Sequence, residues 1–279
     1  MSETRLPTYF ISHGGGPWPY VAEMRARLQV LEASLVDIPR QIPARPRAIL
    51  MVSGHWEAGQ FRVMGNAHPP MVYDYYGFPA HTYSIRYPAP GAPDVARRVQ
   101  QLGQAAGIPI QFDEQQGFDH GTFAPLAVMY PDADVPVLQL SLKAGYDPAA
   151  HLAVGRALAP LRDEGVLIIG SGLSYHNLRL MGPAATLPSA QFDHWLQQAV
   201  VASAPAQRVA QLLQWDKAPA ARICHPAEDH LIPLMVAVGA AEDETATLVY
   251  HEAGFFGGVT ASSFRFGDGA VPTAAGLQH

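Results

Sequence analysis

The chain has 279 residues, of which 48% are hydrophobic and 15% charged, so it is long and apolar enough to fold as one large α/β domain. Its formal net charge of −6 and its two lysines exclude the clustered basic surface that binds nucleic acid, and no apolar stretch reaches the roughly 20 residues that span a bilayer. A single cysteine, Cys224, excludes an internal disulfide, and the N-terminus lacks a signal-peptide layout, so we expect a cytoplasmic protein. We expect this protein to be a monomer or a homodimer.

Short apolar runs alternate with amphipathic stretches along the chain. Strands are predicted at residues 8–12, 48–53, 61–64, 108–112, 135–142, 166–170, 247–251 and 263–266. Helices are predicted at residues 20–35, 93–106, 123–130, 148–162, 191–201, 206–214 and 226–239. This alternation favours a single catalytic α/β domain over residues 1–279, with a central, mostly parallel or mixed β-sheet flanked by helices on both faces. The closing strands are expected to form an antiparallel edge.

The segment 66–93 is crowded with His, Pro, Tyr and Gly and contains the stretch MVYDYYGFPAHTY. A long irregular segment inside a compact domain is usually either functional or disordered. Its many aromatic residues argue against disorder. We therefore interpret it as an ordered loop that covers a site.

Three histidines occupy similar positions after predicted strands. His13 ends the run YFISH, His55 follows ILMVSG, and His176 follows VLIIGSGLSY. A single histidine after a strand is usually an ordinary surface or core residue. Three of them would meet at the carboxyl edge of one sheet, where open α/β sheets bind ligands. The pattern therefore predicts a site built from imidazoles.

A fourth candidate is His230, in the segment HPAEDHLIPL. Pro226 suits the first turn of a helix, which would place His230 about one turn further on. His225, Glu228 and Asp229 are nearby alternatives, any of which could instead cap the helix, but His225 and His230 are five residues apart and do not share a helix face. We expect a metal to bind only one of these histidines, and we favour His230.

His120 lies in the segment GFDHGT, just before a predicted helix. Asp119 could simply cap that helix. The alternative is that the His120 imidazole points at a substrate oxygen. The motif alone does not separate these two interpretations.

Imidazole ligands favour Zn, Fe, Cu or Ni over Mg or Ca, which prefer oxygen. An open position on Fe(II) serves dioxygen chemistry, whereas zinc with a bound water serves hydrolysis. The spacing of the histidines is compatible with both metals.

Several segments between Tyr9 and Leu234 carry a family resemblance: FISHGGGP, ILMVSGHWE, MVYDYYGFP, GFDHGTFAPL, VPVLQLSL, GSGLSYHNLR and HPAEDHLIPL. Through them the sequence resembles the class III (LigB-type) extradiol ring-cleaving dioxygenases, in the branch of the 4,5-DOPA extradiol dioxygenases. The resemblance implies a non-haem metal enzyme that inserts O2 into a catechol-type ring and gives a ring-opened semialdehyde. It also implies Fe(II) as the working metal, with Zn(II) as an alternative occupant in purified protein.

Residue by residue, the resemblance implies that His13, His55 and His230 bind the metal. His176 would lie beside it, either as the acid/base of ring cleavage or as a further ligand. His120 would contact a substrate hydroxyl.

The resemblance further implies that Tyr73, Asp74 and Tyr75 line the substrate pocket. One departure is the triple glycine Gly14–Gly16, where relatives often carry a serine or another small residue. This departure bears on how the substrate fits rather than on the metal.

Three other functions are considered. The HGGG motif also occurs in the oxyanion loop of esterases, but the Gly-x-Ser-x-Gly motif that they require is absent from the chain. A zinc hydrolase could use the same histidines, although the His-Glu-x-x-His signature is missing. A non-enzymatic metal-binding relative is the third, and the complete histidine set argues against it.

Overall fold

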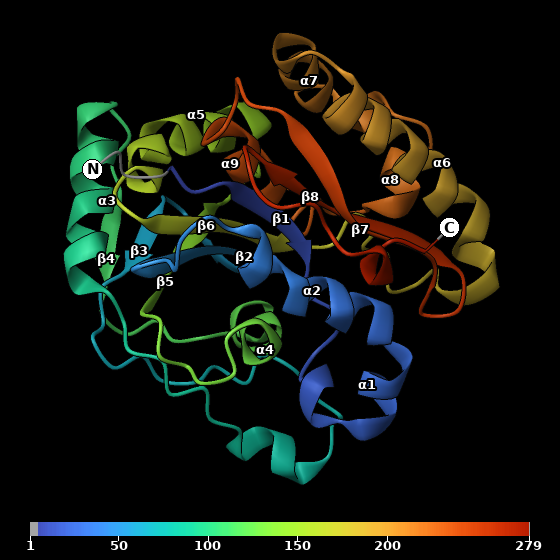
Figure 1. Ribbon diagram of the computed structural model, residues 1–279, viewed down its shortest axis with the longest axis horizontal. Helices are drawn as coiled ribbons and strands as arrows, with labels where there is room; N and C mark the ends of the chain where they lie inside the picture. Colours follow the sequence, from blue (N-terminus) through green and yellow to red (C-terminus); the bar gives the residue numbers. More distant parts are fainter. Residues whose placement is uncertain (1–4, 279) are drawn as a thin grey trace.

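A computed structural model describes residues 5–278, and one mixed sheet forms its centre (Figure 1). The strands are β1 (Thr8–Ser12), β2 (Ala48–Ala58), β3 (Arg62–Met64), β4 (Gln111–Asp113), β5 (Val137–Lys143), β6 (Val166–Gly172), β7 (Ala246–Phe255) and β8 (Val259–Phe266). Within the described residues the sheet has eight strands in the order β4-β3-β5-β2-β6-β1-β8-β7.

The middle of this sheet is parallel, and both of its sides carry antiparallel pairs. Strands β5, β2, β6 and β1 run parallel to one another, whereas β8 is antiparallel to both β1 and β7. On the other side, β3 is antiparallel to β5. Every residue of β1 and β6 is buried, which explains why apolar residues dominate both strands. The predicted parallel centre and antiparallel closing edge are therefore confirmed.

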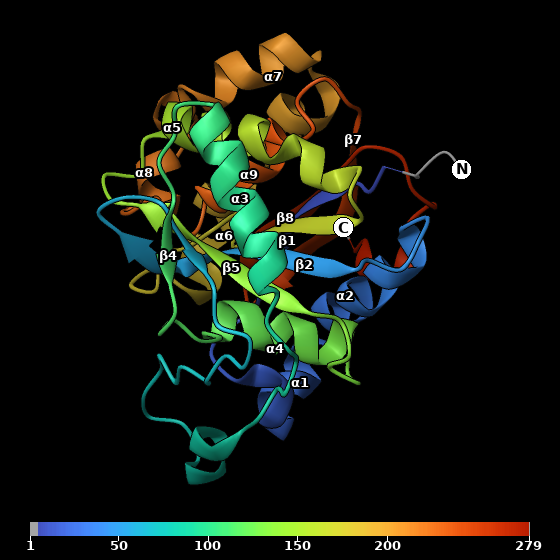
Figure 2. The same cartoon turned by 90° about the vertical axis from the view of Figure 1, so that its left-hand side faces the viewer.

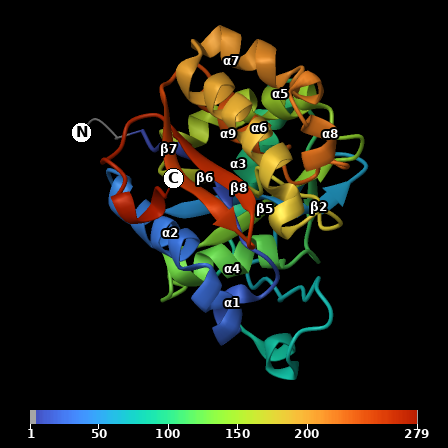
Figure 3. The same ribbon diagram turned by 90° about the vertical axis from the view of Figure 1, so that its right-hand side faces the viewer.

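Helices cover both faces of the sheet, as predicted (Figures 1 and 3). The helix α9 packs on β6 and β1 and is itself covered by α5, while α3 lies beside α5. On the opposite face, α4 contacts β2 and β6, and α2 packs against α4. The helices are α1 (Ala22–Arg27), α2 (Gln29–Gln41), α3 (Pro93–Ala105), α4 (His120–Met129), α5 (Pro148–Leu158), α6 (Thr186–Gln197), α7 (Pro205–Leu212), α8 (Ala221–Cys224) and α9 (Pro233–Gly239).

Two predicted helices differ in the structure. The helix expected at residues 20–35 is broken at Leu28 into α1 and α2. The helix expected at residues 226–239 begins only at Pro233, so the prediction that His230 lies one turn inside a helix was wrong. A helix starting at Pro226 would place Pro233 in its interior, where its ring clashes with the carbonyl four residues earlier and no N–H is available. His230 therefore lies in the turn before α9.

The long segment between β3 and α3 contains only the short 3-10 helix η2 (Ala80–Ser84) and extends beyond the sheet past α4 (Figure 2). Its own tyrosines hold it together. The Tyr73 hydroxyl donates to the Ile85 carbonyl at 2.7 Å, and the Tyr75 hydroxyl donates to the Thr82 carbonyl at 2.5 Å. The segment is therefore ordered, as expected. Among residues 5–278, no helix combines the length and the apolar character that crossing a membrane requires.

Candidate metal centre

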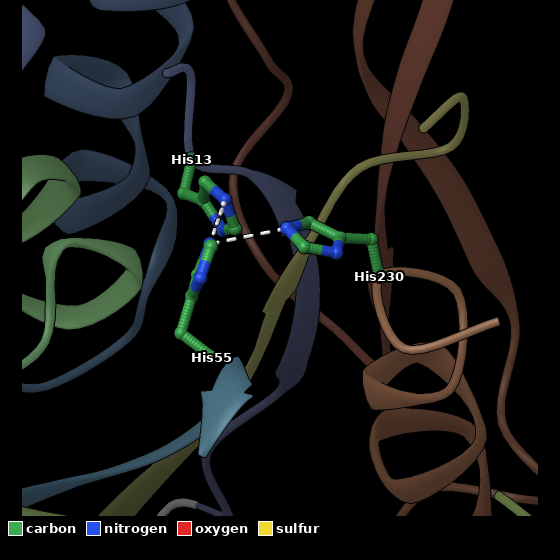
Figure 4. Close-up of side chains that lie close together, drawn as sticks. All are labelled: His13, His55 and His230. Atoms are coloured by element: carbon green, nitrogen blue, oxygen red, sulfur yellow. Dashed lines mark hydrogen bonds between the residues drawn. The ribbon is translucent and has the colours of Figure 1, made fainter. Parts of the chain in front are cut away.

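Three imidazoles from distant parts of the chain converge at the carboxyl edge of the sheet (Figure 4). Nε2 of His55 lies 3.2 Å from Nε2 of His13 and 3.1 Å from Nε2 of His230. Nitrogen ligands at roughly 2.1 Å from a common metal ion are separated from one another by about 3.0–3.4 Å. The spacing of the three nitrogens therefore fits a shared metal ion.

Close backbone packing places His230 next to the sheet. The backbone N–H of Leu173 donates to the His230 carbonyl at 3.0 Å, just after β6 ends. A Cβ atom on Gly172 would lie 2.0 Å from that carbonyl oxygen. Only glycine permits this approach, so the GSG sequence at the end of β6 is required for the turn that carries His230.

Two of the three rings are oriented by carboxylates. Nδ1 of His230 lies 2.8 Å from Oδ2 of Asp229, and Nδ1 of His55 lies 3.3 Å from Oδ2 of Asp74. A carboxylate that accepts the Nδ1 proton fixes the tautomer in which Nε2 carries a lone pair. The Nε2 lone pair of His230 is therefore free for a metal, and the nearby Asp74 carboxylate favours the same tautomer of His55.

The His13 ring is oriented by a hydroxyl group. Its Nδ1 lies 3.1 Å from Oγ of Ser171, and the Ser171 hydroxyl donates its own proton to the Gly121 carbonyl. The serine oxygen is therefore left to accept from the His13 N–H. Ser171 was not singled out from the sequence, because its role depends on a contact between β6 and the residue after β1.

Burial keeps the three imidazoles neutral. It holds the pKa of both His13 and His230 well below the usual 6.5, and the neighbouring imidazoles lower it further. Burial and the proximity of His120 lower the pKa of His55 to about 3. Neutral imidazole is the form that binds a metal, so the site is ready for one at neutral pH.

His176 and His120 flank the three converging rings. The His176 ring stacks on His230, with ring centroids 3.4 Å apart and an angle of 15° between the planes. Its Nδ1 lies 3.9 Å from Oδ1 of Asp229, and burial lowers the pKa of His176. His176 is not one of the three residues whose nitrogens converge.

Asp74 connects His120 to the same centre. Its Oδ1 accepts from Nδ1 of His120 at 2.9 Å and from the His120 backbone N–H at 3.0 Å, while its Oδ2 faces His55. His120 is the first residue of α4, and the Asp119 side chain caps that helix by accepting from the Thr122 N–H. The capping interpretation of Asp119 is thus confirmed, and the helix start directs His120 to the site.

His225 lies outside the cluster. Its Nε2 is 2.9 Å from the Ser174 carbonyl, and its ring packs against Phe192 and Trp215 in the core. The structure thus places His230, and not His225, beside the other imidazoles, and metal binding by His230 stays a prediction.

A cavity of about 520 Å³ opens above the imidazoles and is lined by Asp74, Tyr75, His120 and His176 among others. Tyr73, which was expected to line it, does not, because its hydroxyl is engaged by Ile85 and its ring packs on Tyr83. Tyr76 lines the cavity in its place. The sequence of the loop alone did not indicate which of its tyrosines, Tyr73 or Tyr76, would line the cavity.

Phe255, at the end of β7, and Phe256, in the turn that follows, also line the cavity and were not singled out from the sequence. Their only signal was an aromatic pair flanked by glycines between two predicted strands, in EAGFFGG.

Comparison with known proteins identifies the family. Residues 7–267 match the family described as the catalytic LigB subunit of aromatic ring-opening dioxygenase. The chain belongs to the LigB family. This LigB-family protein is 37% identical to the 4,5-DOPA dioxygenase extradiol of Beta vulgaris, over 93% of this chain and 96% of that protein. It is 33% identical to the protein of the same name from Escherichia coli strain K12, over 96% and 97% of the two chains.

Two further comparisons agree with the LigB assignment. A dioxygenase named tasH from Hapsidospora irregularis is 36% identical over 85% of this chain and 79% of its own length. A crystal structure of an uncharacterized protein from Escherichia coli K12 superposes with a TM-score of 0.75 at 30% identity, covering 94% of this chain and all of that one. The LigB-family protein is thus an aromatic ring-opening dioxygenase, with a small aromatic molecule and O2 as its reactants. The hydrolase and non-enzymatic alternatives lose their support.

Proposed function

We propose that this LigB-family protein is a metal-dependent extradiol dioxygenase that opens a catechol-type ring to a semialdehyde. The observation that carries the proposal is the convergence of three Nε2 atoms, each on a ring whose Nδ1 faces a carboxylate or hydroxyl. Such a set of neutral imidazoles is a good ligand set for Fe(II) or Zn(II).

His13, His55 and His230 would hold the ion, with Fe(II) as the working metal and Zn(II) as an alternative occupant. A bound Fe(II) supplies the redox chemistry that activates dioxygen and a Lewis acid for the two catechol oxygens. The protein orients the three rings through Asp74, Asp229 and Ser171 and so prepares the site before the ion arrives.

His176 would act as the acid/base that accepts a proton from a catechol hydroxyl and later returns one. It lines the cavity and stacks on His230, outside the set formed by His13, His55 and His230. Its ring nitrogen also lies close enough to Asp229 and His230 to form a ligand set with them, so the metal content of a His176 variant separates the two roles. Asp229 lies near its Nδ1 and would stabilise the protonated ring.

His120 would donate a hydrogen bond to a substrate oxygen. Its Nδ1 contacts the Asp74 carboxylate at 2.9 Å, which holds the ring in place, and the residue lines the cavity, which leaves Nε2 for the substrate. The Tyr75 ring, which lines the same cavity, would provide an aromatic wall for the catechol.

Reconstitution with Fe(II) under anaerobic conditions, followed by addition of catechols and air, tests the proposal. We expect stoichiometric oxygen uptake together with a yellow semialdehyde. Both should be lost in His13→Ala and His55→Ala, which should also lose the bound metal, and retained in the control His68→Ala, whose side chain is exposed. Oxygen uptake that is unchanged in His13→Ala, or absent from the metal-loaded protein with every catechol, would contradict the proposal.

A further inference from the structure

The cavity above the imidazoles has a second, apolar wall. Away from the histidines it is lined by Met24, Phe78, Met181, Phe255, Phe256 and Val259. Of the lysines and arginines within residues 5–278, none lines this cavity. The part of a substrate that extends beyond the reacting ring therefore meets hydrocarbon and aromatic surface.

The triple glycine allows two of these aromatic rings to reach the cavity. A Cβ atom on Gly16 would lie 2.6 Å from Cζ of Phe78, and one on Gly15 would lie 3.3 Å from Cζ of Phe256. Gly16 also has a φ of +52°, which disfavours other residues. The departure at Gly14–Gly16 thus makes room for an aromatic wall directly beside His13.

The backbone of Phe256 supports a functional role for that wall. Its φ is +47°, in the left-handed region that a bulky residue rarely adopts. Such conformations cost energy and concentrate at ligand sites, where the surrounding structure maintains them. Here the conformation lies in the turn after β7 that brings the Phe256 ring to the cavity.

Among the described residues, the one side-chain amide on the cavity wall is already engaged by other groups. The Asn177 amide donates to the Ile223 carbonyl at 2.7 Å, and its oxygen accepts from the Arg179 backbone N–H at 3.1 Å. Asp74 is itself a carboxylate and would repel a second one.

The arginines near the cavity either form ion pairs with other side chains or are exposed to solvent. Arg25, next to Met24, pairs with Glu32 at 2.9 Å, and Arg222 pairs with Glu228 at 2.7 Å. Arg179 follows Leu178 in sequence but is exposed and does not line the cavity. A carboxylate on the substrate would therefore be desolvated without a cation to compensate it.

We propose that the cavity selects catechols whose ring substituent is uncharged and apolar, packed against Phe78 and Phe256, and discriminates against catechols that carry a carboxylate. This inference rests on the proposed function of the histidine site.

A matched pair of substrates tests the proposal. The probes are 3-(3,4-dihydroxyphenyl)propanoic acid and its methyl ester, which share the ring and chain and differ mainly in charge. With the Fe(II)-loaded protein we expect kcat/KM for oxygen uptake to be at least about tenfold higher for the ester. An acid that reacts as well as the ester, or better, would overturn the proposal.

Binding to the Zn(II)-loaded protein, measured by calorimetry without oxygen, separates this inference from the proposed function. If neither probe consumes oxygen but the ester binds at least about tenfold more tightly than the acid, the proposed ring-opening function is wrong and the proposed selectivity of the cavity is supported. Equal binding of the two probes would contradict the proposed selectivity for uncharged substituents, whether or not oxygen is consumed.

Substitutions in the wall provide the second test. Phe256→Arg should reduce the preference for the ester by about tenfold, because it places a cation in the cavity, whereas Phe256→Leu should retain the preference. Arg179→Ala should leave the activity toward the acid unchanged. A tenfold loss of that activity in Arg179→Ala would show that the arginine reaches a substrate carboxylate and would overturn the proposal.

Discussion

The Asp229 carboxylate lies 2.8 Å from Nδ1 of His230, the ring nitrogen that does not face His55. This contact fixes both the tautomer and the direction of the imidazole, and it makes Nε2 more basic. Because the two residues are adjacent in sequence, the turn before α9 supplies a proposed ligand together with the group that orients it.

Asp229→Asn should weaken metal binding by about 10–100-fold while the protein remains folded, because the amide retains the shape but not the charge of the carboxylate. Competition with a chelator for Zn(II) measures this affinity. Asp243→Asn, at an exposed position, is the matched control and should bind Zn(II) as the native protein does. An unchanged affinity in Asp229→Asn would show that the carboxylate does not support the ligand.

His176→Ala should reduce turnover by about a hundredfold or more and change the dissociation constant of the catechol little, because the imidazole moves protons rather than holding the ring. Single-turnover oxygen uptake gives the first quantity, and titration of the Zn(II)-loaded protein with catechol gives the second. Loss of bound metal in this variant would instead indicate that His176 is a ligand.

Gly16→Ala should lower the free energy of unfolding by about 1–2 kcal/mol and weaken binding of substituted catechols, because φ is +52° and the new methyl group meets the Phe78 ring. Gly107→Ala is the control: φ is +72° there, but a Cβ atom would have no neighbour within 4 Å. The control should therefore lose stability without any loss of catechol binding. Native catechol affinity in Gly16→Ala would show that the Phe78 ring does not contact the substrate.

His151 makes the fold sensitive to acid. Its Nε2 accepts from the Lys143 backbone N–H at 3.1 Å, and its Nδ1 donates to the Asp147 carbonyl at 2.7 Å. Burial lowers the pKa of His151 from 6.5 to about 4. Because the folded state disfavours the proton, this contribution to stability is complete above pH 6.5 and is lost as the pH falls towards 4.

We expect His151 to account for a loss of about 2 kcal/mol in the free energy of unfolding between about pH 7.5 and pH 5. Urea unfolding of the metal-free protein at several pH values measures it. His151→Gln keeps an acceptor for Lys143 but cannot take up the proton, so its stability should decline less steeply over the same interval. Identical slopes in the two proteins would assign the acid sensitivity to other residues.

The sequence predicted the sheet and the meeting of His13 and His55 because a buried parallel strand must be apolar along its whole length. The polar residue that ends such a run is therefore conspicuous. His230 was identified as a candidate, but its setting was not, because Pro226 and Pro233 each suit the first turn of a helix. A helix that started at Pro226 would hold Pro233 in its interior, which proline disfavours, and the residues after Pro233 pack on β6 and β1.

Other parts of the site depend on contacts that no local pattern encodes. Ser171 orients His13 across two neighbouring strands, and Phe256 meets Gly15 although the two residues are at opposite ends of the chain. Within the loop, the spacing of the aromatic residues did not reveal that the Tyr73 hydroxyl bonds to the backbone of the loop itself, whereas Tyr76 lines the cavity.

The order in which the chain is synthesised gives the metal site a further property. His13 and His55 are 42 residues apart, but His230 follows His55 only after another 175 residues. The strand β8, which pairs with β1, is made later still. A nascent or prematurely terminated chain that ends before His230 carries at most two of the three imidazoles. Tight metal binding by all three imidazoles would therefore report that translation has passed His230, and products truncated before it should be separable from complete ones by their lack of bound metal.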